Sequence, residues 1–147
     1  MTTLNRILDG YTQDAFATRA GLKMHARLQR IVIPNASSDT ESDLVDKIKC
    51  VPGLSVFFDA TAKTEVPVAG YLDGCFLSRR IDRLRIDTNA HKIDILDYKT
   101  DTDKSSRYDK YVAQIKEYVR LLKLVYPDYT VAGYILWTHD FSLEKVY

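Results

Sequence analysis

Three charged residues, Asp82, Asp97 and Lys99, occur in a stretch that otherwise has the pattern of two half-buried strands. Residues 80–101 read as two extended runs joined by a polar turn at residues 87–90. Side chains alternate across a strand, so Asp82 falls on the face of the neighbouring leucine and isoleucine, and Asp97 and Lys99 fall together on an apolar face. Because a carboxylate on an apolar face is costly without a cation nearby, the three residues indicate a shared site.

These residues have the form D…DxK, which suits a hydrolytic centre that uses a divalent cation. Mg²⁺ and Mn²⁺ prefer carboxylate oxygens, and a bound ion would polarise a phosphodiester and activate a water. Lys99 would orient that water and shield developing charge. The pattern is common by itself, so structural alternatives stay open. In these, Asp82 pairs with Arg80 or Arg85, and Asp97 with Lys99 forms a surface cross-strand pair.

The length of 147 residues predicts one domain, residues 1–147, with a core of ordinary size. Hydrophobic residues make up 46% and charged residues 28%, and the formal net charge is +1, so any nucleic-acid surface must be local. Such local clusters follow the second and third predicted strands: Arg79, Arg80, Arg83 and Arg85, then Lys99, Lys104, Arg107 and Lys110.

Two cysteines, Cys50 and Cys75, are too few for a disulfide framework or a four-cysteine metal site, and we expect both to be reduced thiols in the core. No apolar run approaches the roughly 20 residues of a membrane span, and residues 1–11 lack a signal-peptide pattern. The expected location is therefore the cytoplasm, with no membrane association. A GxxxxGK[ST] motif is missing, so a motor ATPase would lie elsewhere on a longer polypeptide or on a partner.

Hydrophobic periodicity changes along the chain from helical to strand-like and back. Helices are predicted at residues 21–33, 44–50, 54–60 and 111–126, with a weaker amphipathic segment around residues 4–8. Strands are predicted at 65–73, 74–87 and 92–100 as an antiparallel meander, at 131–138 as a doubly covered strand, and at 143–147 as an edge strand. Pro67 should lie at an edge or a bulge. This order predicts an α/β fold in which a mixed sheet, the meander plus a further strand, is flanked by helices on both faces.

Several of these segments, in this order, resemble the RecB/AddA-type nuclease domain of the PD-(D/E)XK superfamily. The resemblance covers most of the chain, from about Gly21 to Thr138. Its specific parts are the histidine of GLKMHARLQRI, then IDRL, DYKTD and the Q-xxx-Y helix within QIKEYVRLL. The resemblance implies a restriction-endonuclease-like fold and a deoxyribonuclease that depends on Mg²⁺ or Mn²⁺.

The resemblance also assigns roles to the residues that match the family's motifs. It implies that His25, Asp82 and Asp97 are metal ligands and that the backbone carbonyl of Tyr98 is a further ligand. It implies that Lys99 is the catalytic lysine. Imidazole is a plausible metal ligand, although a single histidine on a helix is more often an ordinary packed residue.

Other residues receive supporting roles near the site and the DNA. Gln114 and Tyr118, at positions i and i+4 of one helix, would form a supporting pair, although Tyr118 also suits simple packing. Glu65 is expected to pair with an arginine. The family often has glycine where this chain has Arg79, which could alter the strand or the approach of DNA. The expected DNA contacts are Arg79, Arg80, Lys104 and Arg107.

Two cysteines cannot hold the iron–sulfur cluster of some relatives, so the chain resembles the branch without an iron–sulfur cluster. In that branch the domain is commonly the C-terminal part of a helicase-nuclease that processes double-strand DNA ends. We therefore expect two partners: DNA, as single strands or duplex ends, and a helicase domain or subunit. The chain would be either a domain of such a protein or a stand-alone relative.

The leading function is exonuclease-type hydrolysis of DNA in end processing and recombinational repair. Two alternatives stay open. One is a non-catalytic module that keeps the fold and binds DNA or a protein, and the presence of His25, Asp82, Asp97 and Lys99 together argues against it. The other is a site-specific endonuclease of the same superfamily.

Overall fold

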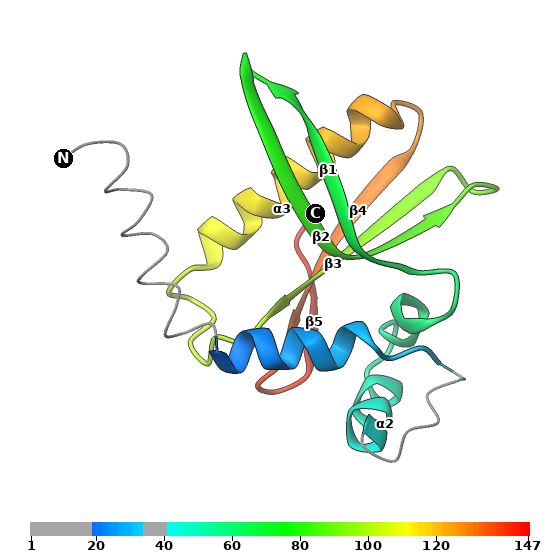
Figure 1. The fold of residues 1–147 in the computed structure, drawn as a ribbon, viewed down its shortest axis with the longest axis vertical. Coiled ribbons are helices and arrows are strands. Elements are labelled where there is room, and N and C mark those ends of the chain that lie inside the picture. The colour runs from blue at the N-terminus through cyan, green and yellow to red at the C-terminus, as the bar shows by residue number, and fades with distance from the viewer. Residues whose placement is uncertain (1–18, 34–40) are drawn as a thin grey trace.

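The chain folds as an α/β structure built on one five-stranded mixed sheet (Figure 1). The computed structural model describes residues 19–33 and 41–147. Its elements are a helix at residues 19–29, α2 (Ser42–Cys50), the 3₁₀ helix η2 (Ser55–Phe58), β1 (Lys63–Leu72), β2 (Cys75–Asp87), β3 (Lys92–Lys99), α3 (Tyr108–Val125), β4 (Thr130–Trp137) and β5 (Ser142–Lys145). The strands lie in the order β1-β2-β3-β4-β5; β3 and β4 are parallel, and the other neighbouring pairs are antiparallel.

Strands β1 and β2 form a long hairpin that extends beyond the rest of the sheet (Figure 1). The hairpin turns at Asp73 and Gly74, whose φ angles are 53° and 78°. Glycine adopts this left-handed conformation without strain, and the predicted turn is confirmed. Strand β1 is an edge of the sheet, so Pro67 lies where the missing N–H costs no ladder hydrogen bond, as predicted.

The ladder of this hairpin is interrupted where Glu65 faces Asp82. The pairs on either side are regular, but Glu65 has a φ of 51°. Before the interruption, Ile81 packs in the core beneath α3, whereas Arg83 enters the core on the opposite face. Regular alternation would put Ile81 and Arg83 on one face. The strand therefore changes face at Asp82.

Helix α3 connects the parallel strands β3 and β4 and packs directly on β4. A Cβ atom at Gly133 would lie 2.3 Å from Ile115 Cγ2, so the close approach of the helix requires glycine at this position. Ile115 is fully buried in this contact. The absence of a side chain on β4 therefore sets the height of α3 above the sheet.

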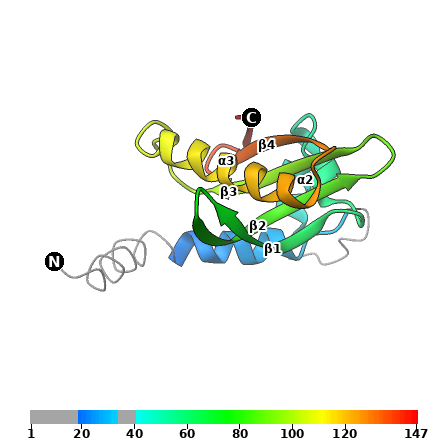
Figure 2. The ribbon, with the colours of Figure 1, turned by 90° about the horizontal axis from the view of Figure 1, so that it is seen from above.

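Helices cover both faces of the sheet and form two cores (Figure 2). One core lies between α3 and the sheet, and the other lies between the sheet and the helix at residues 19–29 with α2 and η2. Alternate residues of β3 enter the two cores: Ile93 and Ile95 face α3, while Leu96 and Tyr98 face the other helices. This arrangement confirms the predicted mixed sheet with helices on both faces.

Arg83 is buried inside the second core, with 1% of its surface exposed. Its guanidinium donates hydrogen bonds to Tyr98 Oη (2.7 Å) and to the carbonyl oxygens of Phe57 (2.9 Å), Leu28 (2.7 Å) and Ile31 (2.8 Å). The same group stacks over a phenylalanine ring of η2, 4.0 Å from its centroid. Arg83 thus joins β2 to the C-terminal end of the helix at residues 19–29. The expectation that it belongs to a basic surface is wrong.

Other details of the sequence prediction also need correction. The first helix ends at residue 29 rather than 33, because the chain turns there to present its carbonyls to Arg83, and Ile33 forms a bridge with Asp59. The segment predicted as a helix at 54–60 is the shorter 3₁₀ helix η2. Cys50 and Cys75 are free thiols as expected, but both are exposed. The amphipathic segment predicted around residues 4–8 lies outside the described residues.

No helix within residues 19–33 and 41–147 is long and apolar enough to cross a membrane.

Candidate active site

The sheet brings the two predicted acidic residues together from neighbouring strands. Arg83 of β2 pairs with Leu96 of β3, and the same antiparallel register continued by one residue sets Asp82 opposite Asp97. Asp82 Oδ2 accepts a hydrogen bond of 2.8 Å from the backbone N–H of Tyr98. The two aspartates lie at the same height on neighbouring strands because of this register and the turn at residues 87–90, where Asp87 accepts two backbone N–H groups.

His25 approaches the same point from the helix at residues 19–29. Its Nδ1 lies 3.6 Å from Asp82 Oδ1, and its ring meets the edge of Tyr98 at 5.0 Å between centroids. Partial burial lowers the pKa of His25, but the hydrogen bond and the charge of Asp82 outweigh it and raise the pKa above its usual value. Neither structural alternative for Asp82 is present, because Arg80 pairs with Glu65 and Arg85 with Asp94.

Asp97 and Lys99 form a close ion pair at the end of β3. Lys99 Nζ lies 2.6 Å from Asp97 Oδ2, and only 4% of the Asp97 side chain is exposed, so the pair is buried and differs from the alternative of a surface pair. Within the described chain, the buried Asp97 Oδ2 accepts no well-aligned hydrogen bond, so the ion pair with Lys99 is what compensates its charge. Burial raises the pKa of Asp97 to about 6; Lys99 opposes the rise, and the charge of Asp82 adds to it.

Helix α3 holds Lys99 from the other side. Lys99 Nζ donates a 2.8 Å hydrogen bond to Gln114 Oε1, and Gln114 Nε2 donates a 2.8 Å bond to Tyr118 Oη. The ammonium also lies over the ring of Tyr111, 4.2 Å from its centroid. Burial, with the charges of Asp97 and Asp82, raises the pKa of Tyr118, so its hydroxyl stays neutral. The predicted pair Gln114 and Tyr118 does lie at the site, and Tyr118 reaches it through Gln114.

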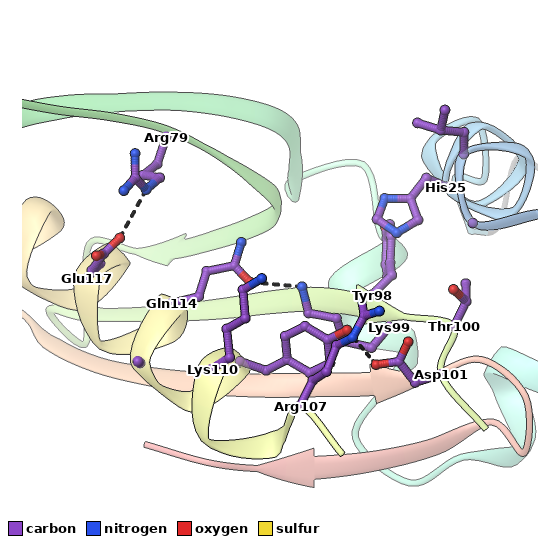
Figure 3. Close-up of a pocket in the computed structure, with 14 residues that line it drawn as sticks. His25, Arg79, Tyr98, Lys99, Thr100, Asp101, Arg107, Lys110, Gln114 and Glu117 are labelled. Carbon is purple, nitrogen blue, oxygen red and sulfur yellow. Dashed lines mark hydrogen bonds and ion pairs between the residues drawn. The ribbon is translucent and has the colours of Figure 1, made fainter. Parts of the chain in front are cut away.

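Of these groups, His25, Tyr98, Lys99 and Gln114 line a cleft of about 550 Å³ between α3 and the helix at residues 19–29 (Figure 3). The aspartates Asp82 and Asp97 and the ring of Tyr118 are not among its lining residues. His25 projects into the cleft from one helix, and Lys99 extends from β3 toward Gln114. Four cationic side chains line the cleft: Arg79, Lys99, Arg107 and Lys110. Only two of the described lining residues are acidic, Asp101 and Glu117. The lining therefore favours an anionic ligand such as a phosphodiester.

Two of the four predicted DNA contacts lie in the cleft and two lie elsewhere. Arg79 and Arg107 line it, and Arg79 Nε pairs with Glu117 Oε2 at 3.0 Å (Figure 3). Arg80 is on the opposite side of the hairpin, 3.5 Å from Glu65, which confirms the expected partner of that acid. Lys104 does not line the cleft and instead pairs with Asp140 at 2.8 Å.

Sequence reasoning gave no role at the site to several residues of the cleft, among them Tyr111, Asp101 and Lys110. Tyr111 is one turn before Gln114 on α3, and its hydroxyl donates a hydrogen bond to Asp101. Burial first, and then Asp101, raise the pKa of Tyr111 to about 12. Lys110 was counted only as part of a charge cluster. The i, i+3 spacing of Tyr111 and Gln114 was the signal that could have identified Tyr111, since it puts them on one helix face.

The donor atoms at this site fit a hard divalent cation in type. An imidazole, two carboxylates and the backbone of Tyr98 at a strand end are the kinds of ligand such sites use, and the buried Asp97 Oδ2 lacks an aligned donor. In the described part of the chain, however, no three histidine, cysteine or acidic side chains converge as a ready-made metal site. Instead, Lys99 forms an ion pair with Asp97, and His25 pairs with Asp82. Binding of a cation would therefore have to loosen these two pairs.

The raised pKa of Asp97 predicts a pH-dependent cost of folding in metal-free protein. Its carboxyl ionises at a pKa of about 6 when folded, against 3.8 as its ordinary value, so the native state carries no penalty below about pH 4. The penalty grows as the pH rises toward 6 and stays constant above it. We expect Asp97→Asn to remove this dependence. The unfolding free energy of the variant minus that of the wild type should rise by about 1–3 kcal/mol between pH 4 and pH 7.5.

Urea unfolding in EDTA at several pH values measures this difference. The substitution also removes the charge partner of Lys99. This loss shifts the difference in unfolding free energy by a similar amount at every pH, so its dependence on pH is unchanged. A difference that is the same at every pH would contradict the assignment of a buried, raised carboxyl.

No family model matches the chain, and no curated protein matches it.

Proposed function

We propose that this chain is a metal-dependent deoxyribonuclease that hydrolyses phosphodiester bonds. One observation supports the proposal most directly. Asp82, Asp97, Lys99 and His25 come from three separate segments of the chain and meet beside a cationic cleft. Two largely buried carboxylates with a lysine and an imidazole are expensive to maintain as structure alone. Their grouping is what cation-assisted phosphodiester hydrolysis requires.

The chain's own side chains would hold the substrate and the water in place. A bound Mg²⁺ or Mn²⁺ would polarise the scissile phosphate and activate a water. Asp82, Asp97 and His25 would hold the ion, together with the carbonyl of Tyr98. Lys99 would orient the attacking water and stabilise charge on the phosphate in the transition state. Because Gln114 and the ring of Tyr111 also hold Lys99, its ammonium would stay in the cleft when Asp97 takes up the cation.

The phosphate backbone would be positioned by the other cationic residues of the cleft. Arg107 and Lys110 lie near the start of α3, and Arg79 faces them from the hairpin. Contacts of this kind fix the register of a nucleic acid without reading its sequence. The proposal therefore favours exonuclease-type digestion in DNA end processing over site-specific cutting. It also includes a helicase domain or subunit that supplies the strand and a location in the cytoplasm with the DNA.

Divalent-dependent cleavage is the direct test. Wild-type protein incubated with linear single-stranded DNA should release short products in Mg²⁺ or Mn²⁺, and EDTA should stop the reaction completely. Linear and circular DNA compared by gel would separate progressive degradation from endonuclease cutting. Wild-type protein that is inert with both metals on single-stranded, duplex and circular DNA would overturn the proposal.

One observation favours the non-catalytic module as a second candidate. The Lys99–Asp97 pair is closed, and Asp82 already accepts the N–H of Tyr98. A module that only binds DNA would keep this closed arrangement. It would bind DNA equally well in EDTA and in Mg²⁺, with strong salt dependence and no cleavage.

A further inference from the structure

The outward face of the β1–β2 hairpin carries a strip of exposed residues that no described part of the chain covers. Three cross-strand pairs two residues apart share this face, and all six residues are exposed: Pro67 with Arg80, Ala69 with Ser78, and Tyr71 with Phe76. The alternate pairs face α3, as the packing of Val66 and Val68 shows. We refer to these six residues as the hairpin strip.

The two aromatic side chains of the strip are far more exposed than their size leads one to expect. Tyr71 is 70% exposed and Phe76 is 60% exposed, and their rings meet edge to face at 5.4 Å between centroids. The turn beside them is fixed, because Arg120 of α3 donates two hydrogen bonds to Asp73, at 2.9 and 3.0 Å. The hairpin therefore presents its rings on a supported arm (Figure 1).

The remaining residues of the strip favour a nucleic-acid strand over a protein partner. Ala69 and Ser78 have small side chains that leave the middle of the strip flat, and the strip holds no leucine, isoleucine or valine. Arg80 lies at the inner end with 70% of its side chain exposed, and its 3.5 Å pair with Glu65 is weak enough to be exchanged for a phosphate. Aromatic faces followed by a guanidinium are the elements that bind unpaired bases and their backbone.

The strip also leads toward the candidate active site. Phe76 and Arg80 are four residues apart on β2, about 13 Å, and Asp82 follows Arg80 by about 7 Å. We propose that Tyr71 and Phe76, with Arg80, bind single-stranded nucleic acid by stacking of unpaired bases. The inference rests on the proposed function only in taking this strand to be the substrate.

Binding measured without cleavage tests the proposal. Fluorescence anisotropy of a labelled oligothymidylate in EDTA compares wild-type protein with the variant Tyr71→Ala, Phe76→Ala. We expect the variant to bind about ten-fold or more weakly. The ring-preserving variant Tyr71→Phe, Phe76→Tyr should bind within about two-fold of wild type.

Two controls keep the interpretation specific. Tyr147→Ala removes another exposed aromatic side chain, 46% exposed, beside β4 and away from the hairpin, and should leave affinity unchanged. An abasic oligonucleotide of equal length should bind the wild type and the ring-less variant alike. Equal affinity of the ring-less variant and wild type for oligothymidylate, as a protein-docking surface would give, would overturn the proposal. An equal loss on the abasic strand would also overturn it.

Cleavage by the wild type, measured in parallel with Mn²⁺, separates this inference from the proposed function. Ring-dependent binding without any cleavage would leave the hairpin strip standing and remove the nuclease. Cleavage by the wild type with ring-independent binding would do the reverse.

Discussion

Replacing Lys99 with alanine should reduce cleavage of single-stranded DNA by about 10²–10⁴-fold, the range expected when a group that acts on the transition state is removed. The structure gives the reason, since Asp97, Gln114 and the ring of Tyr111 all contact the Lys99 ammonium. Its ammonium is thereby directed to one place in the cleft. The loss should fall mainly on kcat, because Arg79, Arg107 and Lys110 still hold phosphates.

Lys123→Ala is the matched control for that variant, since Lys123 is an exposed lysine in the last turn of α3 and does not line the cleft. It should cleave DNA like the wild type. Circular dichroism and urea unfolding check that Lys99→Ala remains folded, because the substitution leaves the buried Asp97 without its cation. Cleavage within about three-fold of wild type by folded Lys99→Ala would exclude Lys99 from the chemistry, given that true catalytic groups contribute far more.

The largest effect on stability should come from Arg83. We expect Arg83→Ala to lower the unfolding free energy by about 3–5 kcal/mol, because it leaves several buried carbonyls and the hydroxyl of Tyr98 without their donor. Arg83→Lys should rescue little of this loss, since an ammonium cannot reproduce the planar fork of five donors. Urea unfolding measured by circular dichroism gives both values.

Arg85→Ala is the matched control two residues further along β2. Its side chain is 34% exposed and lies 3.8 Å from Asp94, so its loss should cost less than about 1 kcal/mol. Similar destabilisation by the two alanine variants would contradict the structural role given to Arg83. A folded Arg83→Ala protein should also have a loosened first helix, and hydrogen exchange at residues 19–29 would detect it.

The fold was largely readable from the sequence because strong local patterns agreed with it. The alternation in residues 92–99, the Asp73-Gly74 turn and the stripe on α3 each had one good structural solution. The same alternation, with the turn at residues 87–90, predicted that Asp82 and Asp97 share a site. The 3₁₀ helix η2 could not be predicted in detail, since a short apolar segment such as residues 54–60 is compatible with either helix type.

The errors have a common physical origin in contacts between distant segments. Arg83 looked like one charge among several on a strand. Only the change of face at Asp82 directs it into a core where carbonyls of two segments and the hydroxyl of Tyr98 accept its hydrogen bonds. Likewise, the sequence shows that Asp97 and Lys99 share a face but not that burial would close them into a pair. Tyr111 lies in a segment that the sequence predicts as a helix, but that prediction does not reveal that its ring supports an ammonium.

Gly133 has a consequence for the cleft although it lies outside it. The missing side chain on β4 lets Ile115 settle against the backbone, and Ile115 is adjacent in sequence to Gln114. The position from which the Gln114 amide contacts Lys99 is thus set by the backbone of β4 at Gly133, which carries no side chain. A methyl group added at Gly133 would push the helix away from the sheet. It would shift the side chains of the candidate site relative to one another, while every side chain in the cleft kept its identity.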